Sequence, residues 1–281
     1  MFKGIGVEFN NNFAQILENR LNNLPQSLSY ECINLSIVGR SPRGYLEILK
    51  NFGVHYNPDI LLVGLFVGND ILESYIPETS YTLKFKIKSW QPSRWFLVKY
   101  LTIAHLVLSE STVADQLLTK STIRHRDESI PIFSPRTFID LEAYRSRMYR
   151  PDLQYLLKDP RGIDQYQTMF TALEKIAQIC QDRNIELYLI IIPDQFAVDE
   201  VLRNEVIMDK KIDPQKIDLT LPNNKIRAFC RVENVNVLDF TDFLMERNNK
   251  QNQFLIRDTH LNSQGHLSLA EFLFDNISFS R

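Results

Sequence analysis

The stretch that decides the fold reads Pro58-Asp59-Ile60-Leu61-Leu62-Val63-Gly64-Leu65-Phe66-Val67-Gly68-Asn69-Asp70. Residues 60–67 are almost continuously apolar and lack the alternation of a strand with one face in water, so they predict a strand covered on both faces. Such strands are typical of parallel sheets that lie between layers of helices. Gly68, Asn69 and Asp70 follow at the carboxyl end of the strand, which is where open α/β sheets bind their ligands.

The rest of the chain alternates strand and helix patterns around this strand. Residues 187–192 form a second apolar run closed by Pro193, and residues 30–38 and 235–240 have shorter strand-like patterns. Helical spacing of apolar residues occupies the intervals, at residues 13–21, 43–49, 164–182, 224–232 and 263–277. The alternation predicts an α/β fold, a three-layer α/β/α doubly wound parallel sheet with right-handed crossovers. We expect residues 60–67 and 187–192 to be central strands of that sheet.

One long interval breaks the alternation. Residues 71–162 show no clear strand–helix unit and far exceed an ordinary loop in length. They contain both tryptophans, Trp90 and Trp95, and an amphipathic helix pattern over residues 95–108. We therefore expect a single domain over residues 1–281 with an insertion at about 71–162, lying over the carboxyl edge of the sheet. The insertion either shapes a substrate pocket or only packs against the domain.

Composition argues against several classes of partner. The 281 residues contain 32 Lys plus Arg and 34 Asp plus Glu, a net charge of −2. This balance argues against nucleic acid as the main partner, because phosphate neutralisation needs clustered basic residues. No run approaches the ~18–20 apolar residues of a membrane span, so we expect none in this chain. Residues 1–6 lack the apolar region of a secretory signal, and the compartment stays open because a signal or anchor could lie upstream.

The metal-ligating residue types do not form a metal-binding pattern. Cys32, Cys180 and Cys230 are far apart and none belongs to a C-x-x-C motif, which favours buried free thiols over a zinc or redox site. His260 and His266 lack the spacing of a metal-ligand pair. The sequence therefore predicts no metal site.

The clearest chemistry lies in Asp258-Thr259-His260-Leu261-Asn262, directly ahead of the last helical pattern. A histidine acts as a general base when a carboxylate orients its other ring nitrogen, and Asp258 is near enough to do so within one loop. His266, at the start of the helix, is better explained by a structural role.

Two further residues follow predicted strands. Gly39 comes directly after residues 30–38, and a glycine lets the backbone approach a ligand and present its N–H. Asn69 follows residues 60–67, where its amide can donate into a cleft. A turn explains Gly39 and a helix cap explains Asn69 when each is taken alone, so both alternatives stay open.

Together and in this order, these segments resemble the SGNH, or GDSL-like, hydrolase family. The family pattern has a Gly-Asp-Ser block, a glycine block, a Gly-x-Asn-Asp-like block and a C-terminal Asp-x-x-His or Asp-x-His block. Residues 34–39 (Asn-Leu-Ser-Ile-Val-Gly) are similar to the glycine block, residues 58–70 to the Asn block, and residues 258–262 with Gly265-His266 to the last block. The resemblance covers nearly all of the chain outside residues 71–162. It implies the flavodoxin-like SGNH fold.

The resemblance also implies a mechanism, because the family hydrolyses esters through a serine nucleophile. By residue-to-residue correspondence, His260 is the general base, Asp258 orients it, and the oxyanion hole consists of the Gly39 N–H and the Asn69 side chain. The implied substrates are small-molecule acyl esters or carbohydrate esters, with no cofactor. The same residues serve an O-acyltransferase, which is an alternative activity.

The chain departs from the family at the Gly-Asp-Ser block. Gly4-Ile5-Gly6-Val7 is similar to the residues that follow this block in the family, and the first serine of the chain is Ser27. The nucleophile and the family's first strand, which lies between the strands corresponding to residues 30–38 and 60–67, would then fall immediately before Met1. We expect a chain truncated before the nucleophile and inactive as an esterase in this form. The alternative is a non-catalytic SGNH-like binding module.

Overall fold

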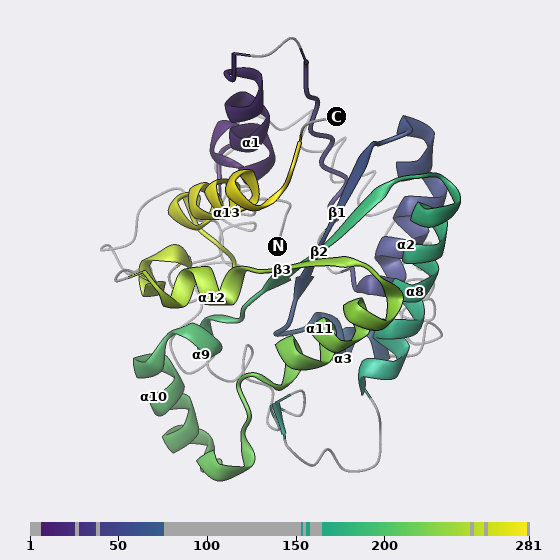
Figure 1. Cartoon of the computed structure of the whole chain (residues 1–281). Coiled ribbons are helices and arrows are strands. Elements are labelled where there is room, and N and C mark those ends of the chain that lie inside the picture. The colour runs from purple at the N-terminus through teal and green to yellow at the C-terminus, as the bar shows by residue number, and fades with distance from the viewer. Residues whose placement is uncertain are drawn as a thin grey trace, which may run out of the picture. The chain divides into compact units, whose positions relative to one another are not determined.

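The computed structural model describes residues 7–25, 28–37, 40–75, 153, 156–157, 165–247, 250–255 and 258–279. These residues belong to one compact unit of mixed α/β structure (Figure 1). Three parallel strands, β1 (Ile60–Phe66), β2 (Glu186–Ile192) and β3 (Asn236–Asp239), hydrogen-bond in the order β1-β2-β3. The apolar runs at 60–67 and 187–192 and the shorter pattern at 235–240 therefore form parallel strands, as predicted.

The helices predicted at residues 13–21, 43–49, 164–182, 224–232 and 263–277 are also present, whereas the pattern at 95–108 lies outside the described residues. In the described residues the α-helices are α1 (Phe13–Asn22), α2 (Pro42–Asn51), α3 (Asp70–Tyr75), α8 (Gln165–Asp182), α9 (Gln195–Val198), α10 (Glu200–Lys210), α11 (Leu221–Glu233), α12 (Phe240–Met245) and α13 (Ser263–Asn276). Short 3₁₀ helices lie at η1 (Phe9–Asn11), η2 (Gly53–Tyr56), η4 (Pro214–Lys216) and η5 (Lys250–Gln253). Side-chain caps start several helices: the Asn12 carboxamide oxygen accepts from Ala14 N at 3.0 Å, and that of Asn262 accepts from Gly265 N at 3.0 Å.

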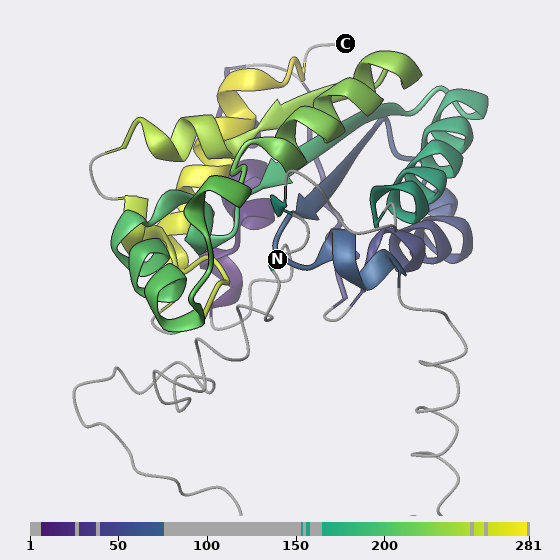
Figure 2. The same ribbon diagram turned by 90° about the horizontal axis from the view of Figure 1, so that it is seen from below.

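Helices cover both faces of the sheet (Figure 2). Alternate strand residues point to opposite faces. Leu65 and Leu189 pack in one core with side chains from α2, α8 and α11, whereas Ile190 and Ile192 pack in a second core with side chains from α1, α12 and α13. The described residues thus form the three layers that the strand and helix alternation predicts.

The position of β1 differs from the prediction. The strand is at the edge of the described sheet, because it pairs with β2 alone, and Ile60, Leu61 and Leu62 are only half-buried. The expectation that residues 60–67 form a central strand with both faces covered holds for the carboxyl half, where Leu65 and Phe66 are buried. By contrast, β2 has neighbours on both edges and is buried from Leu187 to Ile192.

The strand predicted at residues 30–38 is wrong for the described part of that range. Residues 28–37 belong to no strand or helix, and residues 38 and 39 lie outside the described residues. The reason is the absence of a ladder partner, since a cavity separates this segment from β1.

The predicted insertion at 71–162 lies almost entirely outside the described residues. Its first residues, 71–75, continue α3 and pack against α8, so they belong to a helical layer of the domain. Of the remainder, the structure describes only residues 153, 156 and 157. None of the helices that the structure describes combines the length and apolarity that a membrane crossing requires.

Candidate functional site

The loop that carries Asp258 and His260 is held by backbone hydrogen bonds on both of its flanks. Leu255 N donates to His260 O at 2.9 Å, and Asn262 N donates to Gln253 O at 3.0 Å. An antiparallel bridge between Phe254 and Leu261 closes the base of the loop. The loop leads into α13, whose first turn is capped by the side chain of Asn262.

Within this loop, Asp258 contacts His260 as the sequence predicts. One carboxylate oxygen, Oδ1, accepts from the backbone N–H of His260 at 2.9 Å and also contacts ring nitrogen Nδ1. A carboxylate only accepts, so Nδ1 is a protonated nitrogen, and in the neutral ring Nε2 then carries the free lone pair. The side chain of His260 is 24% exposed and that of Asp258 is 11% exposed. The pair thus has the arrangement of an oriented general base.

Asn69 lies in the turn between β1 and α3. Its carbonyl accepts from Glu73 N at 2.8 Å, which places Asn69 at the start of α3, but its side-chain amide makes no hydrogen bond within the described residues. The side chain is therefore available as a donor rather than used as a helix cap. The preceding Gly68 has no room for a side chain, since a methyl group there would lie 2.8 Å from Asp194 Oδ2 and 2.7 Å from the ring of Phe66.

Asn69 and His260 line the same cavity, although about 190 residues separate them in the chain. The cavity has a volume of about 900 Å³, and Asn34, Ser36 and Asp194 also line it. The third predicted donor, the Gly39 N–H, lies outside the described residues. Of the four predicted site residues, Asn69 and His260 therefore line one cavity, and Asp258 contacts His260.

Sequence reasoning missed Asp194 as part of this cavity. Asp194 follows β2, is 3% exposed and accepts from Phe196 N at 3.2 Å, so it caps α9. The available signal was its place directly after the apolar run 187–192 and Pro193. Asp194 adds a carboxylate to the wall shared with Gly68.

Asp70 is a second buried acid beside the site. It is 1% exposed, and its carboxylate accepts from Phe66 N at 2.8 Å and from the Tyr45 hydroxyl at 3.0 Å. Burial raises the pKa of Asp70 from 3.8 to about 7, because the surrounding protein solvates its charge poorly, and the two hydrogen bonds oppose this shift without cancelling it. Asp70 therefore links the start of α3 to the carboxyl end of β1 and to α2. Ionisation of this buried carboxyl group is unfavourable.

We expect Asp70→Asn to become more stable relative to the parent chain as the pH rises. A carboxyl group whose pKa is higher in the folded than in the unfolded state binds an extra proton between the two values, so stability falls as the pH rises through about 7. The asparagine keeps an acceptor oxygen for Phe66 N and Tyr45 but cannot ionise. Between pH 5 and pH 8, the difference in unfolding free energy between variant and parent should change by about 2–3 kcal/mol in favour of the variant.

Urea denaturation of both chains at several pH values measures this difference. Asp182→Asn, at an exposed position near the end of α8, is the matched control and should show no such change. An Asp70→Asn variant that tracks the parent chain at every pH would contradict the proposed cost of ionising Asp70.

His266 has the structural role expected from its sequence position. It is 1% exposed, and its Nδ1 accepts from Phe13 N at 3.2 Å, which joins the start of α13 to the start of α1. Burial lowers the pKa of His266 to about 4, so the ring is neutral near pH 7 and can accept this bond.

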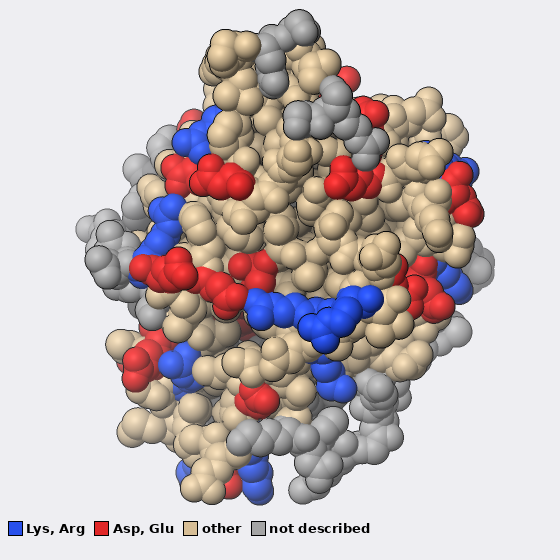
Figure 3. Space-filling model, in the orientation of Figure 1, with Lys and Arg blue, Asp and Glu red and all other residues tan. Residues whose placement is uncertain are grey.

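Charges and cysteines do not point to another site. Basic and acidic residues lie close together on the face shown in Figure 3, and the described ion pairs include Arg227 with Asp239 and with Asp242. Among the residues that the structure describes, no group of three His, Cys, Asp or Glu is arranged to hold a metal ion. Cys32, Cys180 and Cys230 are free, and burial raises the pKa of each thiol.

Comparison of the chain with protein-family models, curated proteins and solved structures yields no match.

Proposed function

We propose that the chain provides the histidine–aspartate part of a serine ester hydrolase of the SGNH type. The contact between Asp258 and Nδ1 of His260 carries this proposal, because it leaves Nε2 of His260 as a base on the wall of the cavity that Asn69 also lines. The family is proposed because residues 34–39, 58–70 and 258–262 resemble three blocks of the SGNH pattern. On the same grounds, we propose that the three-layer structure is the SGNH fold.

The reaction assigns one task to each residue. A serine hydroxyl attacks the ester carbonyl, and His260 Nε2 takes the hydroxyl proton while Asp258 stabilises the resulting imidazolium. The Asn69 amide and the Gly39 N–H donate to the oxyanion, each donor contributing about 10²–10³ in rate. His260 then returns the proton to the leaving alcohol, and water or a second alcohol takes the acyl group. Small acyl esters and carbohydrate esters are the proposed substrates.

The described residues include no serine, threonine or cysteine hydrogen-bonded to Nε2 of His260. In the proposal, the nucleophile belongs to a Gly-Asp-Ser block ahead of Met1. The alternative is a binding module that keeps the cleft but has no nucleophile. The activity test below distinguishes this module from the esterase.

The test compares the chain with an elongated chain that carries Ile-Val-Val-Ile-Leu-Gly-Asp-Ser before Met1. We expect the elongated chain to hydrolyse p-nitrophenyl acetate, and a serine-directed phosphonate to abolish this turnover. The original chain should show no phosphonate-sensitive turnover, because His260 and Asn69 assist an attack but cannot supply the attacking oxygen. In the elongated chain, His260→Ala should abolish turnover.

The controls distinguish a chain that folds but does not react from a chain that does not fold. His55→Ala changes an exposed histidine in η2, before the amino end of β1, and should leave the rate of the elongated chain unchanged. Phosphonate-sensitive turnover by the original chain would show that another serine is the nucleophile. An elongated chain that binds the ester reversibly but never turns it over would support the binding module.

A further inference from the structure

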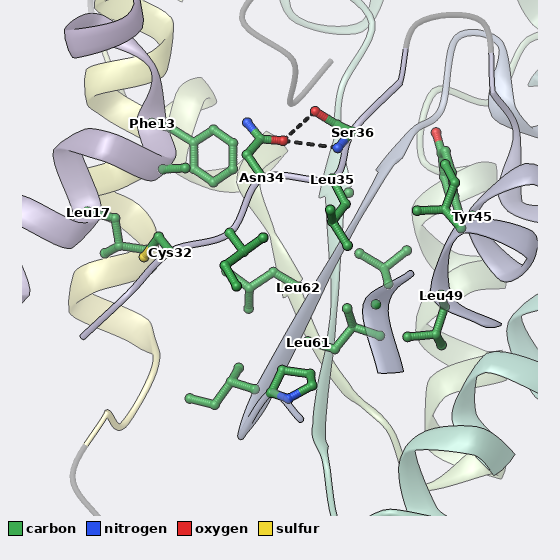
Figure 4. A pocket seen from close by; sticks show the side chains of 18 of the residues that line it. Phe13, Leu17, Cys32, Asn34, Leu35, Ser36, Tyr45, Leu49, Leu61 and Leu62 are labelled. Carbon is green, nitrogen blue, oxygen red and sulfur yellow. Dashed lines mark hydrogen bonds between the residues drawn. The ribbon is translucent and has the colours of Figure 1, made fainter. Parts of the chain in front are cut away.

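The hydrogen bonds that the described residues make to His260 all come from its own loop. Its backbone N–H and ring nitrogen Nδ1 contact Oδ1 of Asp258, and its carbonyl oxygen accepts from Leu255 N at 2.9 Å. On another wall of the cavity, the polar residues Asn34 and Ser36 bond to each other, with Ser36 N donating to Asn34 Oδ1 at 3.1 Å (Figure 4). The position of His260 therefore depends on what holds the two ends of its loop together.

Asn262 joins both ends of this loop through one side chain. Its carboxamide nitrogen donates to the carbonyl oxygens of Asn252, at 2.7 Å, and Phe254, at 3.0 Å, which lie just ahead of the loop. Its carboxamide oxygen accepts from Gly265 N at 3.0 Å and so caps α13. The cap needs only the oxygen, whereas the bonds to residues 252 and 254 need both hydrogens of the nitrogen.

The bond to Phe254 links Asn262 to the backbone that holds His260. Phe254 is 4% exposed, and a buried carbonyl that loses its donor is unfavourable, so the chain around it would have to shift to find another. Phe254 forms the antiparallel bridge with Leu261, and the next residue, Leu255, donates to the His260 carbonyl. A shift of residues 252–254 would therefore break this bond and release the loop.

A second anchor holds the same segment at a different place. The side-chain oxygen of Gln253 accepts from the Ser268 hydroxyl at 2.8 Å, and both side chains are buried. Ser268 lies in the second turn of α13, so this bond fixes the segment to the helix and not to the end of the loop. The two anchors can therefore be removed one at a time and their effects on His260 compared.

We propose that Asn262 is the positioning residue of His260: its carboxamide nitrogen holds residues 252–254 against the end of the loop and thereby keeps the imidazole against Asp258. Asn262 does not line the cavity, so it acts through the backbone. Its consequence for turnover rests on the proposed function, whereas the contact between His260 and Asp258 can be measured in the original chain without any reaction.

The test replaces Asn262 by aspartate and by serine in the original chain. Both residues cap helices about as well as asparagine does. An aspartate carboxylate has no donor for residues 252 and 254, and a serine hydroxyl has one donor on a shorter side chain. Two signals report on the loop at pH 7. One is amide hydrogen exchange at Leu255, and the other is the deshielded proton signal of His260 Nδ1–H, assigned by its absence in His260→Gln.

We expect Asn262→Asp to accelerate exchange at Leu255 by about 10²-fold and to abolish the His260 Nδ1–H signal. Asn262→Ser should accelerate the same exchange by about 10-fold and weaken the signal, because it removes the bonds without placing a charge near the carbonyls. Exchange at Gly265 should stay unchanged in both variants, since the new side chains still cap α13. The serine variant decides the question if the aspartate repels the carbonyls strongly enough to unfold the chain.

Two controls separate positioning from a general loss of stability. Ser268→Ala removes the second anchor and should lower the melting temperature without changing either loop signal. Asn276→Asp makes the same substitution at the end of α13, where the Asn276 carboxamide donates to Phe272 O at 2.8 Å, and it should also leave both signals unchanged.

The other outcomes contradict the proposal in different ways. Slow Leu255 exchange and an intact His260 signal in the Asn262 variants would reduce Asn262 to a helix cap. Equal changes in Ser268→Ala would show that any loosening of the segment displaces His260. Faster exchange at Gly265 together with Leu255 would place the fault in the cap.

Turnover separates this proposal from the proposed function. In the elongated chain that carries the serine, Asn262→Ser should lower kcat by about 10–10²-fold with little change in KM, because the base is misplaced while the cavity is kept. An elongated chain that never hydrolyses the ester, combined with the expected loop signals, would refute the proposed function alone. A kcat that Asn262→Ser leaves unchanged in an active elongated chain would refute the positioning role alone.

Discussion

Asp258→Asn in the serine-elongated chain is expected to lower kcat by about 10³–10⁴. The substituted asparagine would retain an oxygen that accepts from the backbone N–H of His260, a bond now 2.9 Å long, so the loop should keep its conformation. What disappears is the negative charge beside Nδ1 of His260, which stabilises the imidazolium formed during serine attack. The loss should therefore fall on kcat, with little change in KM or in the melting temperature.

Initial rates on p-nitrophenyl acetate, together with a melting curve, separate these effects. Asp194→Asn is the informative comparison, since Asp194 lines the same cavity but its carboxylate caps α9. It should lower kcat much less than Asp258→Asn. Equal losses from the two variants would show that Asp258 contributes only to the general electrostatics of the cavity and does not orient the base.

The sequence predicted elements well where one local pattern was long and unambiguous. β2 is buried from Leu187 to Ile192, the range of the predicted apolar run. The helix predicted at residues 164–182 differs from α8 by one residue at its start. Helices α9 and α12 escaped prediction because four and six residues are too few to show a helical period. Their local signal is instead a capping aspartate near the carboxyl end of a strand: Asp194, two residues past β2, caps α9, and Asp239, the last residue of β3, caps α12.

Segment 28–37 shows what a sequence pattern leaves open. Its apolar residues are typical of a strand, but a strand exists only when a partner supplies the other half of each hydrogen bond. Here the side chains of Asn22 and Glu18 in α1 accept hydrogen bonds from backbone N–H groups of the segment. On the side that faces β1, the segment lines a cavity. The propensity is local, whereas the partner is a property of the whole fold.

The same difference between local patterns and contacts made by the whole fold applies to the candidate site. Asp258 and His260 are two residues apart, so the sequence predicts their contact directly, and the structure contains it. Asp70 and Tyr45 are 25 residues apart and meet only because α2 and α3 pack together, so their hydrogen bond has no sequence signal. The roles of Asn69 and His260 in a reaction stay predictions, although both line one cavity.

Gly265→Ala is expected to destabilise the chain by about 3 kcal/mol and to lower the rate of the serine-elongated chain by about 10²-fold. Gly265 lies in the first turn of α13, where a methyl group would be 2.2 Å from the carbonyl oxygen of Gln253 and 2.9 Å from Leu261. The Gln253 carbonyl cannot move away alone, because it accepts from Asn262 N at 3.0 Å and so holds one flank of the His260 loop. Relief of the clash must therefore separate the loop from α13 or distort the helix start, and either movement displaces His260.

Urea denaturation and initial rates measure the two effects, with Gln264→Ala as the matched control. Gln264 is the exposed neighbour of Gly265 in the same turn, so the control adds an alanine to α13 without a clash and should change neither quantity. A Gly265→Ala variant that loses stability but keeps its full rate would mean that the helix start, and not the loop, absorbs the methyl group. In that case the position of His260 would depend on the hydrogen bonds of residues 253–262 alone, independently of how closely the loop packs on α13.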